Sequence, residues 1–131
     1  MTRLVRYLRY AVLDQVERIR RRPRRRKFYR GPVRSKKYKA WIRTLPSAVS
    51  GRMGCEAAHV GHDGGMRQKA SDTTCVPLTP EEHREYHQIG RKDFEKKYGI
   101  NLDLVAEALF RTWCSLQAAR RARKGDRDNA R

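Results

Sequence analysis

The sequence predicts a small α+β fold, in which a short two-stranded unit with a following helix is flanked by further helices and by basic segments. The length of 131 residues suits one domain with one modest core. Apolar residues recur at helical spacing near both ends of the chain, whereas the middle holds short extended apolar segments. All four histidines lie in that middle part, where we expect the chemistry.

The first part of the chain, residues 1–34, is predicted to be a basic helix and arm. Apolar residues such as Leu4 and Leu8 recur at helical spacing over residues 3–20, and arginines fill much of the remaining surface. Pro23 ends this helix, because proline lacks the backbone N–H that a helix requires. An extended basic linker is expected over residues 24–33.

The second part, residues 35–102, is predicted to be the chemical module. Ser35 is the expected N-cap of a short helix that ends before Pro46. The expected order after it is a loop or hairpin at 47–54, a strand at 55–60, a glycine-containing loop at 61–71 and a second strand at 75–78.

Two short helices are predicted to close this module. Thr79, the proline after it and Glu82 form the pattern of a capping box at the start of a helix over residues 80–89. A second helix over residues 92–98 is closed by Gly99.

The third part, residues 103–131, is predicted to be one helix with a basic tail. The helix begins at Asp103, and its end is expected to fray after Ala119, where the sequence becomes basic. The residues expected on its inner side are Leu104, Val105, Ala108, Leu109, Trp113 and Leu116.

Positive charge is concentrated outside the module. The net charge is +18, and residues 1–44 hold 17 Lys and Arg against two acidic residues. The run from Arg20 to Lys27 is denser than solubility requires, and phosphates would relieve the repulsion between its charges. DNA, duplex or single-stranded, is therefore the expected partner. The residues expected to contact it are Arg20, Arg21, Arg22, Arg24, Arg25, Arg26, Lys27, Arg30, Lys36 and Lys37.

Several classes of protein are disfavoured. No apolar run approaches the roughly 20 residues of a membrane span, so no membrane partner is expected. The arginine-rich N-terminus does not resemble a secretory signal, which favours a cytoplasmic protein of a bacterium or phage. Three cysteines without a C-x-x-C pair support neither a disulfide scaffold nor a four-cysteine zinc site, so Cys55 and Cys75 are expected as buried free thiols on the two strands.

The histidines form the most informative pattern. His83 and His87 lie four residues apart, so one helical turn places both imidazoles on one face, close enough to share a metal ion. The spacing alone also fits two exposed histidines on a polar helix. The order of a strand ending in His59, a loop, a second strand and this helix favours a metal site in a ββα unit of about 30 residues.

This order resembles the HNH (His-Me finger, ββα-metal) endonucleases, in particular the phage-type proteins related to the recombination-enhancement nucleases. The resemblance covers residues 35–102, and it implies a ββα-metal finger and a metal-dependent DNA endonuclease or nickase. The segments that carry it are Glu56–Val60, Gly64-Gly65, Ser71-Asp72, Val76–Leu78 and His83–His87.

The resemblance also implies a role for each histidine. His59 would be the general base, and His83 and His87 would bind one divalent ion at the scissile phosphate. Mg²⁺ or Mn²⁺ is favoured for this ion, and Zn²⁺ or Ni²⁺ is the alternative. Activity should fall as the pH drops towards about 6, because protonated imidazoles neither accept a proton nor bind a metal.

The chain departs from the family at two positions of the site. The residue before the base, which is often a metal ligand in the family, is Ala58 here. Asp72 is our first candidate for the third ligand, with His62 or Asp63 as accessory candidates. The asparagine that orients the base in the family is also absent, and Thr74 or Asp72 stands near its position.

A structural zinc is not expected, because this chain has Ser47, Ser50 and Thr79 where many relatives carry the cysteines of a zinc knuckle. Packing would have to hold the module together. The side chains expected to provide it are Trp41, Leu45, Leu78, Phe94 and Tyr98.

Two alternatives to the enzyme remain at this stage. One is a non-catalytic nucleic-acid-binding protein with a degenerate finger, and the other is an RNA- or ribosome-associated basic protein with an incidental histidine pair. Glu56 either orients a histidine or, as we favour, is an exposed or arm-paired strand residue. The oligomeric state is not determined by the sequence, and a homodimer would suit a small finger that cuts both strands.

Overall fold

The computed structural model describes Asp14, Glu17, residues 33–61 and residues 70–129. Asp14 and Glu17 are helical, in agreement with the helix predicted over residues 3–20. The rest of that helix, nearly all of the basic linker and most of the glycine-containing loop lie outside the described residues.

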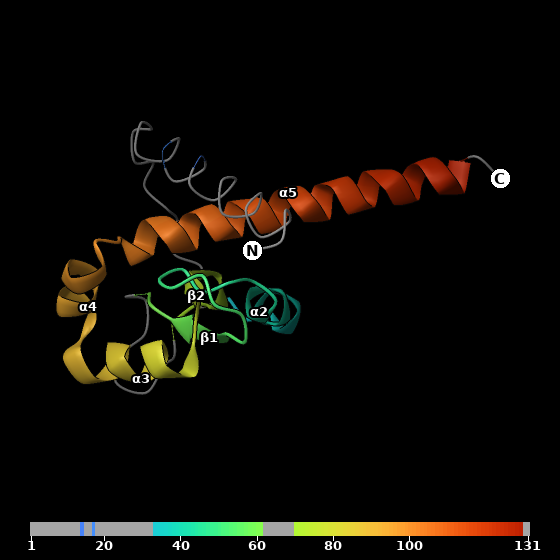
Figure 1. Cartoon of the computed structure of the whole chain (residues 1–131). Coiled ribbons are helices and arrows are strands. Elements are labelled where there is room, and N and C mark those ends of the chain that lie inside the picture. Colours follow the sequence, from blue (N-terminus) through green and yellow to red (C-terminus); the bar gives the residue numbers. More distant parts are fainter. Residues whose placement is uncertain (1–13, 15–16, 18–32, 62–69, 130–131) are drawn as a thin grey trace.

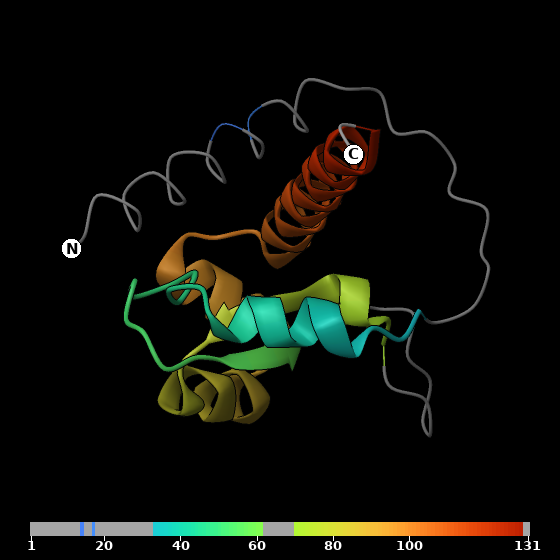
Figure 2. The ribbon, with the colours of Figure 1, turned by 90° about the vertical axis from the view of Figure 1, so that its right-hand side faces the viewer.

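A two-stranded antiparallel sheet lies between helices (Figures 1 and 2). Strand β1 pairs with β2 so that His59 is opposite Cys75 and Glu56 is opposite Leu78. Both views place α3 on one side of this sheet and α5 on the other. The elements in chain order are α2 (Lys36–Arg43), β1 (Glu56–His59), the 3-10 turn η1 (Asp72–Thr74), β2 (Cys75–Leu78), α3 (Pro80–Ile89), α4 (Arg91–Tyr98) and α5 (Leu102–Asn129).

The described chain is thus a small α+β fold, as predicted, and its helix ends follow the predicted signals. The Ser35 hydroxyl accepts a hydrogen bond from the Tyr38 N–H at the start of α2. Thr79 and Glu82 form the reciprocal capping box of α3. Gly99 ends α4 with a φ of 63°, a conformation that glycine adopts without strain.

The core fills the space between the sheet and the helices. Leu45, Leu78 and Phe94 are buried in it, while Trp41 and Tyr98 are partly buried against it, which confirms their predicted packing role. Trp41 and Trp113 stack at a ring distance of 5.4 Å and join α2 to α5. The other buried members are Tyr38, Ile42, Ala58, Val60, Cys75, Val76, Leu102, Ala106 and Leu109.

Helix α5 differs from its prediction in extent and in its buried face. It begins at Leu102 and continues to Asn129, so the predicted fraying after Ala119 is wrong. The Ala, Arg and Lys of this stretch are strong helix formers, which sustain the helix without packing. Leu102 and Ala106 belong to the buried face, whereas Leu116 is 39% exposed, because the end of α5 extends past the sheet (Figure 1).

None of the described helices combines the length and apolar character of a membrane span.

Replacing Phe94 by alanine should strongly destabilise the protein. The Phe94 ring is fully buried, between Tyr86 and Tyr98, and its loss leaves a cavity in a small core. We expect the free energy of unfolding to fall by about 3–5 kcal/mol in urea denaturation. Met53→Ala is the control, because the Met53 side chain is 57% exposed and its truncation should change stability by less than about 0.5 kcal/mol.

Candidate functional site

His59 and Asp72 form a hydrogen-bonded pair at the end of β1. The distance from Nε2 of His59 to Oδ1 of Asp72 is 2.8 Å. Asp72 opens the turn η1, just before β2, so the antiparallel pairing of the strands brings the two residues together. An ionised carboxylate only accepts hydrogen bonds, so Nε2 of His59 carries the proton and Nδ1 keeps a free lone pair.

Asp72 is buried as a charged group among several partners. Its side chain is 1% exposed, and its Oδ2 accepts a hydrogen bond of 2.7 Å from the Ser35 N–H. Lys39 Nζ lies 3.5 Å from Oδ2, and Arg34 Nη1 lies 3.7 Å from Oδ1. Burial alone would raise the pKa of Asp72, but the hydrogen bonds from His59 and Ser35 and the charge of Lys39 lower it below its usual value. The carboxylate therefore stays ionised and orients the His59 ring.

The start of the described module holds this aspartate in place. The Val33 N–H donates to the Ser71 hydroxyl at 3.0 Å, and the Asp72 N–H donates to the Val33 carbonyl at 2.8 Å. Arg34 also donates to the Ala70 carbonyl at 2.7 Å. The residues that directly follow the basic arm in sequence are thus fastened to the turn that carries Asp72.

Cys75 completes a group of three donors with His59 and Asp72. One potential ligand atom of each residue lies within 4.8 Å of the others. Cys75 is a free thiol and is fully buried. Burial, together with the nearby charge of Asp72, raises the pKa of this thiol to about 12. These three residues could hold a metal ion, and no other group of three or more such donors occurs in the part of the chain that the structure describes.

A second arrangement joins β1 to α3. Glu56 accepts a hydrogen bond from Nδ1 of His83 at 2.7 Å, and the two Nε2 atoms of His83 and His87 are 3.1 Å apart. Because Nδ1 of His83 carries the proton, its Nε2 presents a lone pair towards His87. Glu56 therefore orients a histidine, whereas the sequence favoured an exposed or arm-paired strand residue. Its side chain is nevertheless 53% exposed.

The donor chemistry of the histidine pair fits a divalent cation. Metal–nitrogen distances are about 2.0–2.1 Å, so two nitrogens bound to one ion at a right angle lie about 3 Å apart. The Nε2 atoms of His83 and His87 are 3.1 Å apart in a hydrogen bond between the two rings, and a bound ion would replace that hydrogen bond at nearly the same spacing. A carboxylate on the other nitrogen of a ligating histidine is a common support of metal sites, and Glu56 provides one.

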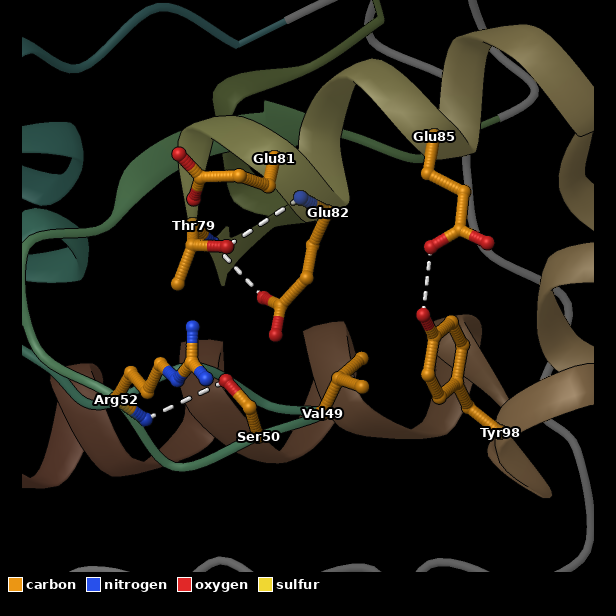
Figure 3. Close-up of a pocket in the computed structure, with 8 residues that line it drawn as sticks. All are labelled: Val49, Ser50, Arg52, Thr79, Glu81, Glu82, Glu85 and Tyr98. Carbon is orange, nitrogen blue, oxygen red and sulfur yellow. Dashed lines mark hydrogen bonds between the residues drawn. The ribbon is translucent and has the colours of Figure 1, made fainter.

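Ser47, Ser50 and Thr79 all interact with the Glu82 carboxylate, and Figure 3 shows Thr79 beside it. Oε2 of Glu82 accepts hydrogen bonds from the Ser47 hydroxyl at 2.5 Å and from the Thr79 N–H at 2.8 Å. Burial would raise the pKa of Glu82, but the hydrogen bonds from Ser47, Ser50 and Thr79 lower it. This polar cluster fastens the loop after α2 to the start of α3.

An acidic pocket lies beside this cluster. Its volume is about 390 Å³, and Glu81, Glu85 and Tyr98 are among the residues that line it. The Tyr98 hydroxyl donates a hydrogen bond of 2.5 Å to Glu85 (Figure 3). Lys97 forms an ion pair with the same carboxylate, so the negative charge of Glu85 is already balanced.

The Glu82 cluster should make stability fall in acid. A carboxyl group with a lowered pKa in the folded state stabilises the fold above its unfolded pKa of about 4.3, and this stabilisation is lost as the pH falls through the folded value. Glu82→Gln should lower the free energy of unfolding by about 1–3 kcal/mol at pH 7 and lose less stability than the wild type below about pH 5. Urea denaturation between pH 7 and pH 3 measures both effects. Glu81→Gln, at a side chain that is 69% exposed, should behave like the wild type.

The remaining predicted site residues are placed as follows. Thr74 lies in η1, where its hydroxyl donates to the Ser71 carbonyl at 2.7 Å and does not orient His59. Ala58 is fully buried in the core. Lys36 and Lys37 are exposed on the first turn of α2. The predicted residues outside the described part of the chain are His62, Asp63, Arg20, Arg21, Arg22, Arg24, Arg25, Arg26, Lys27 and Arg30.

Asp72 lies against His59 in the structure, whereas the contacts of His83 and His87 are to each other and to Glu56. Of the two roles predicted for Asp72, the contact with His59 favours orientation of that imidazole over ligation of an ion at the histidine pair. Sequence reasoning missed Lys39 and the functional potential of Cys75. The register of the two predicted strands was the one signal that could have placed Cys75 opposite His59.

A comparison with protein families matches residues 15–114, most of the chain, to the family described as "Protein of unknown function (DUF968)". No curated protein and no solved structure matched the chain.

Proposed function

We propose that this chain, which belongs to the DUF968 family, is a metal-dependent DNA endonuclease or nickase of the HNH type. The observation that carries the proposal is that β1 supports two oriented histidine sites at once. At its end, His59 is held by Asp72, and at its start, Glu56 holds His83 beside His87. The order of β1, β2 and α3 along the chain supports the proposal, because a ββα-metal finger has two strands followed by a helix.

In this proposal His59 is the general base that takes a proton from the attacking water. The Asp72 carboxylate fixes the proton on Nε2, so Nδ1 is the atom that accepts the new proton. The buried negative charge of Asp72 then stabilises the imidazolium that forms. Asp72 is a positioning residue, because it acts on the reaction only through His59.

His83 and His87 would hold the divalent ion through their Nε2 atoms, with Glu56 fixing the orientation of His83. A bound cation supplies charge stabilisation for the phosphate and for the leaving 3′ oxygen. Mg²⁺ or Mn²⁺ would keep several waters at a site with so few protein ligands, whereas the two imidazole donors by themselves also suit Zn²⁺ or Ni²⁺.

The two histidine sites lie apart along β1. Glu56 and His59 are three residues apart, about 10 Å along the strand, and strand alternation places them on opposite faces of the sheet.

The positive charge outside the module would hold the DNA. Lys36 and Lys37 are exposed and follow the basic arm directly, next to the residues that fasten Asp72. Contacts of this kind bind phosphates without reading base sequence. Asp72 also fastens the start of the module through Ser35 and Lys39, but a protein that only bound nucleic acid has no chemical use for an oriented imidazole at His59, which favours the enzyme over the degenerate finger.

The test is the cleavage of supercoiled plasmid by the purified chain with Mg²⁺ or Mn²⁺. We expect nicked circles that a DNA ligase reseals, because hydrolysis with a leaving 3′ oxygen produces a 3′ hydroxyl and a 5′ phosphate. EDTA should stop the reaction. Salt-sensitive binding without any nicking would reject the endonuclease and support the non-catalytic alternative.

A further inference from the structure

The group formed by His59, Asp72 and Cys75 differs in chemistry from the histidine pair on α3. It offers one nitrogen, one oxygen and one sulfur, all within 4.8 Å of one another. A thiol is a poor ligand for Mg²⁺ but a preferred ligand for Zn²⁺ and similar soft or borderline ions. The base proposed for cleavage is thus a member of a second possible donor set, of a different selectivity.

The fold holds these three donors in place. His59 and Cys75 are directly opposite each other in the ladder, and side chains of such pairs lie on the same face of a sheet. Asp72 is held from behind by the hydrogen bond of the Ser35 N–H to Oδ2, and its Oδ1 faces His59. The ligand atoms of tetrahedral zinc are about 3.3–3.8 Å apart, so the 2.8 Å between Nε2 of His59 and Oδ1 of Asp72 must widen and the Cys75 sulfur must move closer to both for an ion to bind.

One of the three donors is partly exposed to solvent. His59 is 24% exposed, while Asp72 and Cys75 are almost fully buried behind it. Three protein ligands leave a fourth position for water in a tetrahedral site. The positive side chains of Arg34 and Lys39 already balance the charge of the Asp72 carboxylate. Attraction to that carboxylate alone therefore does not hold a cation, and an ion that also bonds well to the Cys75 thiolate is favoured.

We propose that His59, Asp72 and Cys75 form a second metal site, selective for Zn²⁺ over Mg²⁺, whose occupation switches off the base function of His59. Zn²⁺ would bind Nε2 of His59, Oδ1 of Asp72 and the Cys75 thiolate. The Cys75 proton is released to solvent, and the imidazole proton moves from Nε2 to Nδ1. His59 then has no free lone pair with which to accept a proton from water.

The proposed binding of Zn²⁺ does not depend on endonuclease activity, whereas the proposed inhibition by Zn²⁺ rests on the proposed function. Co²⁺ is the probe for binding, because it replaces Zn²⁺ in such sites and gives a sulfur-to-cobalt charge-transfer band only when a thiolate is a ligand. We expect this band on titrating the wild-type chain with Co²⁺, and its displacement by Zn²⁺.

Substitutions test which residues bind the cobalt ion. Cys75→Ser and Cys75→Ala should abolish the band, whereas Cys55→Ser, at another buried free thiol, should keep it. The His83→Ala/His87→Ala double variant should also keep it. His59→Ala, at a partly exposed position, should weaken Co²⁺ binding by at least about 10–100-fold, which tests the site even if both Cys75 variants fail to fold. A wild type without the band, or a band that survives in folded Cys75→Ser, would overturn the proposal.

Inhibition is measured in the plasmid assay. Micromolar Zn²⁺ added to a reaction with millimolar Mg²⁺ should stop cleavage by the wild type but not by Cys75→Ser. Equal inhibition of both proteins would overturn the switch. If the cobalt band appears but no condition gives cleavage, the metal site stands and the endonuclease does not.

Discussion

Replacing His83 and His87 together by alanine should reduce metal-supported cleavage to the level seen in EDTA. The double variant lacks both Nε2 atoms that would hold the ion, so α3 no longer offers a protein donor and only water could bind the metal there. Isothermal titration with Mn²⁺ should show binding to the wild type and none to the double variant. The chain should still fold, because His87 is exposed and His83 is 24% exposed.

Two further variants make this result specific. Arg84→Ala lies on the same helix, at a side chain that is 72% exposed, and should leave Mn²⁺ affinity unchanged. Glu56→Gln should weaken Mn²⁺ binding by about 10–100-fold, because it disturbs the group that orients His83 without removing a donor. Mn²⁺ affinity that is the same in the double variant and the wild type would show that the ion binds elsewhere.

His59→Ala should lower the single-turnover cleavage rate by about 10²–10⁴-fold, the usual contribution of a general base. DNA binding should be unchanged, because His59 contributes no permanent positive charge to the phosphate contacts. Fluorescence anisotropy with a labelled duplex measures the binding on the same samples. The contrasting variant is Lys36→Ala/Lys37→Ala, which should weaken binding but keep the rate once the DNA is saturated. Parallel losses of binding and rate in His59→Ala would contradict its role as the base.

The sequence was sufficient for those parts of the fold that local signals determine. The Ser35 cap, the capping box at Thr79 and the left-handed Gly99 each have a short-range cause, and the structure has all three. The end of α5 could not be predicted in this way. Charge density at Arg120 and Arg121 suggested fraying, while the helix propensity of the same residues sustains the helix to Asn129.

Local sequence patterns indicated which residues contact each other on one element, but not the contacts made between elements. The spacing of His83 and His87 determines that they meet, because one helical turn separates them. The partners of His59 depend instead on the register of the two strands and on a 3-10 turn that no sequence pattern predicted. The sequence therefore predicts Asp72 as a ligand of the ion at His83 and His87, whereas in the structure Asp72 contacts His59, and the sequence gives Cys75 no role beyond that of a buried thiol.

The central claim is that the β1–β2–α3 module cleaves DNA with His59 as its base. The most direct measurement is plasmid nicking in Mg²⁺ by identically purified wild type and His59→Ala, at protein concentrations at which both bind all the DNA. We predict rapid nicking by the wild type, none in EDTA, and at least about a 100-fold slower reaction for His59→Ala. Equal rates for the two proteins, or no nicking by either, would contradict the claim.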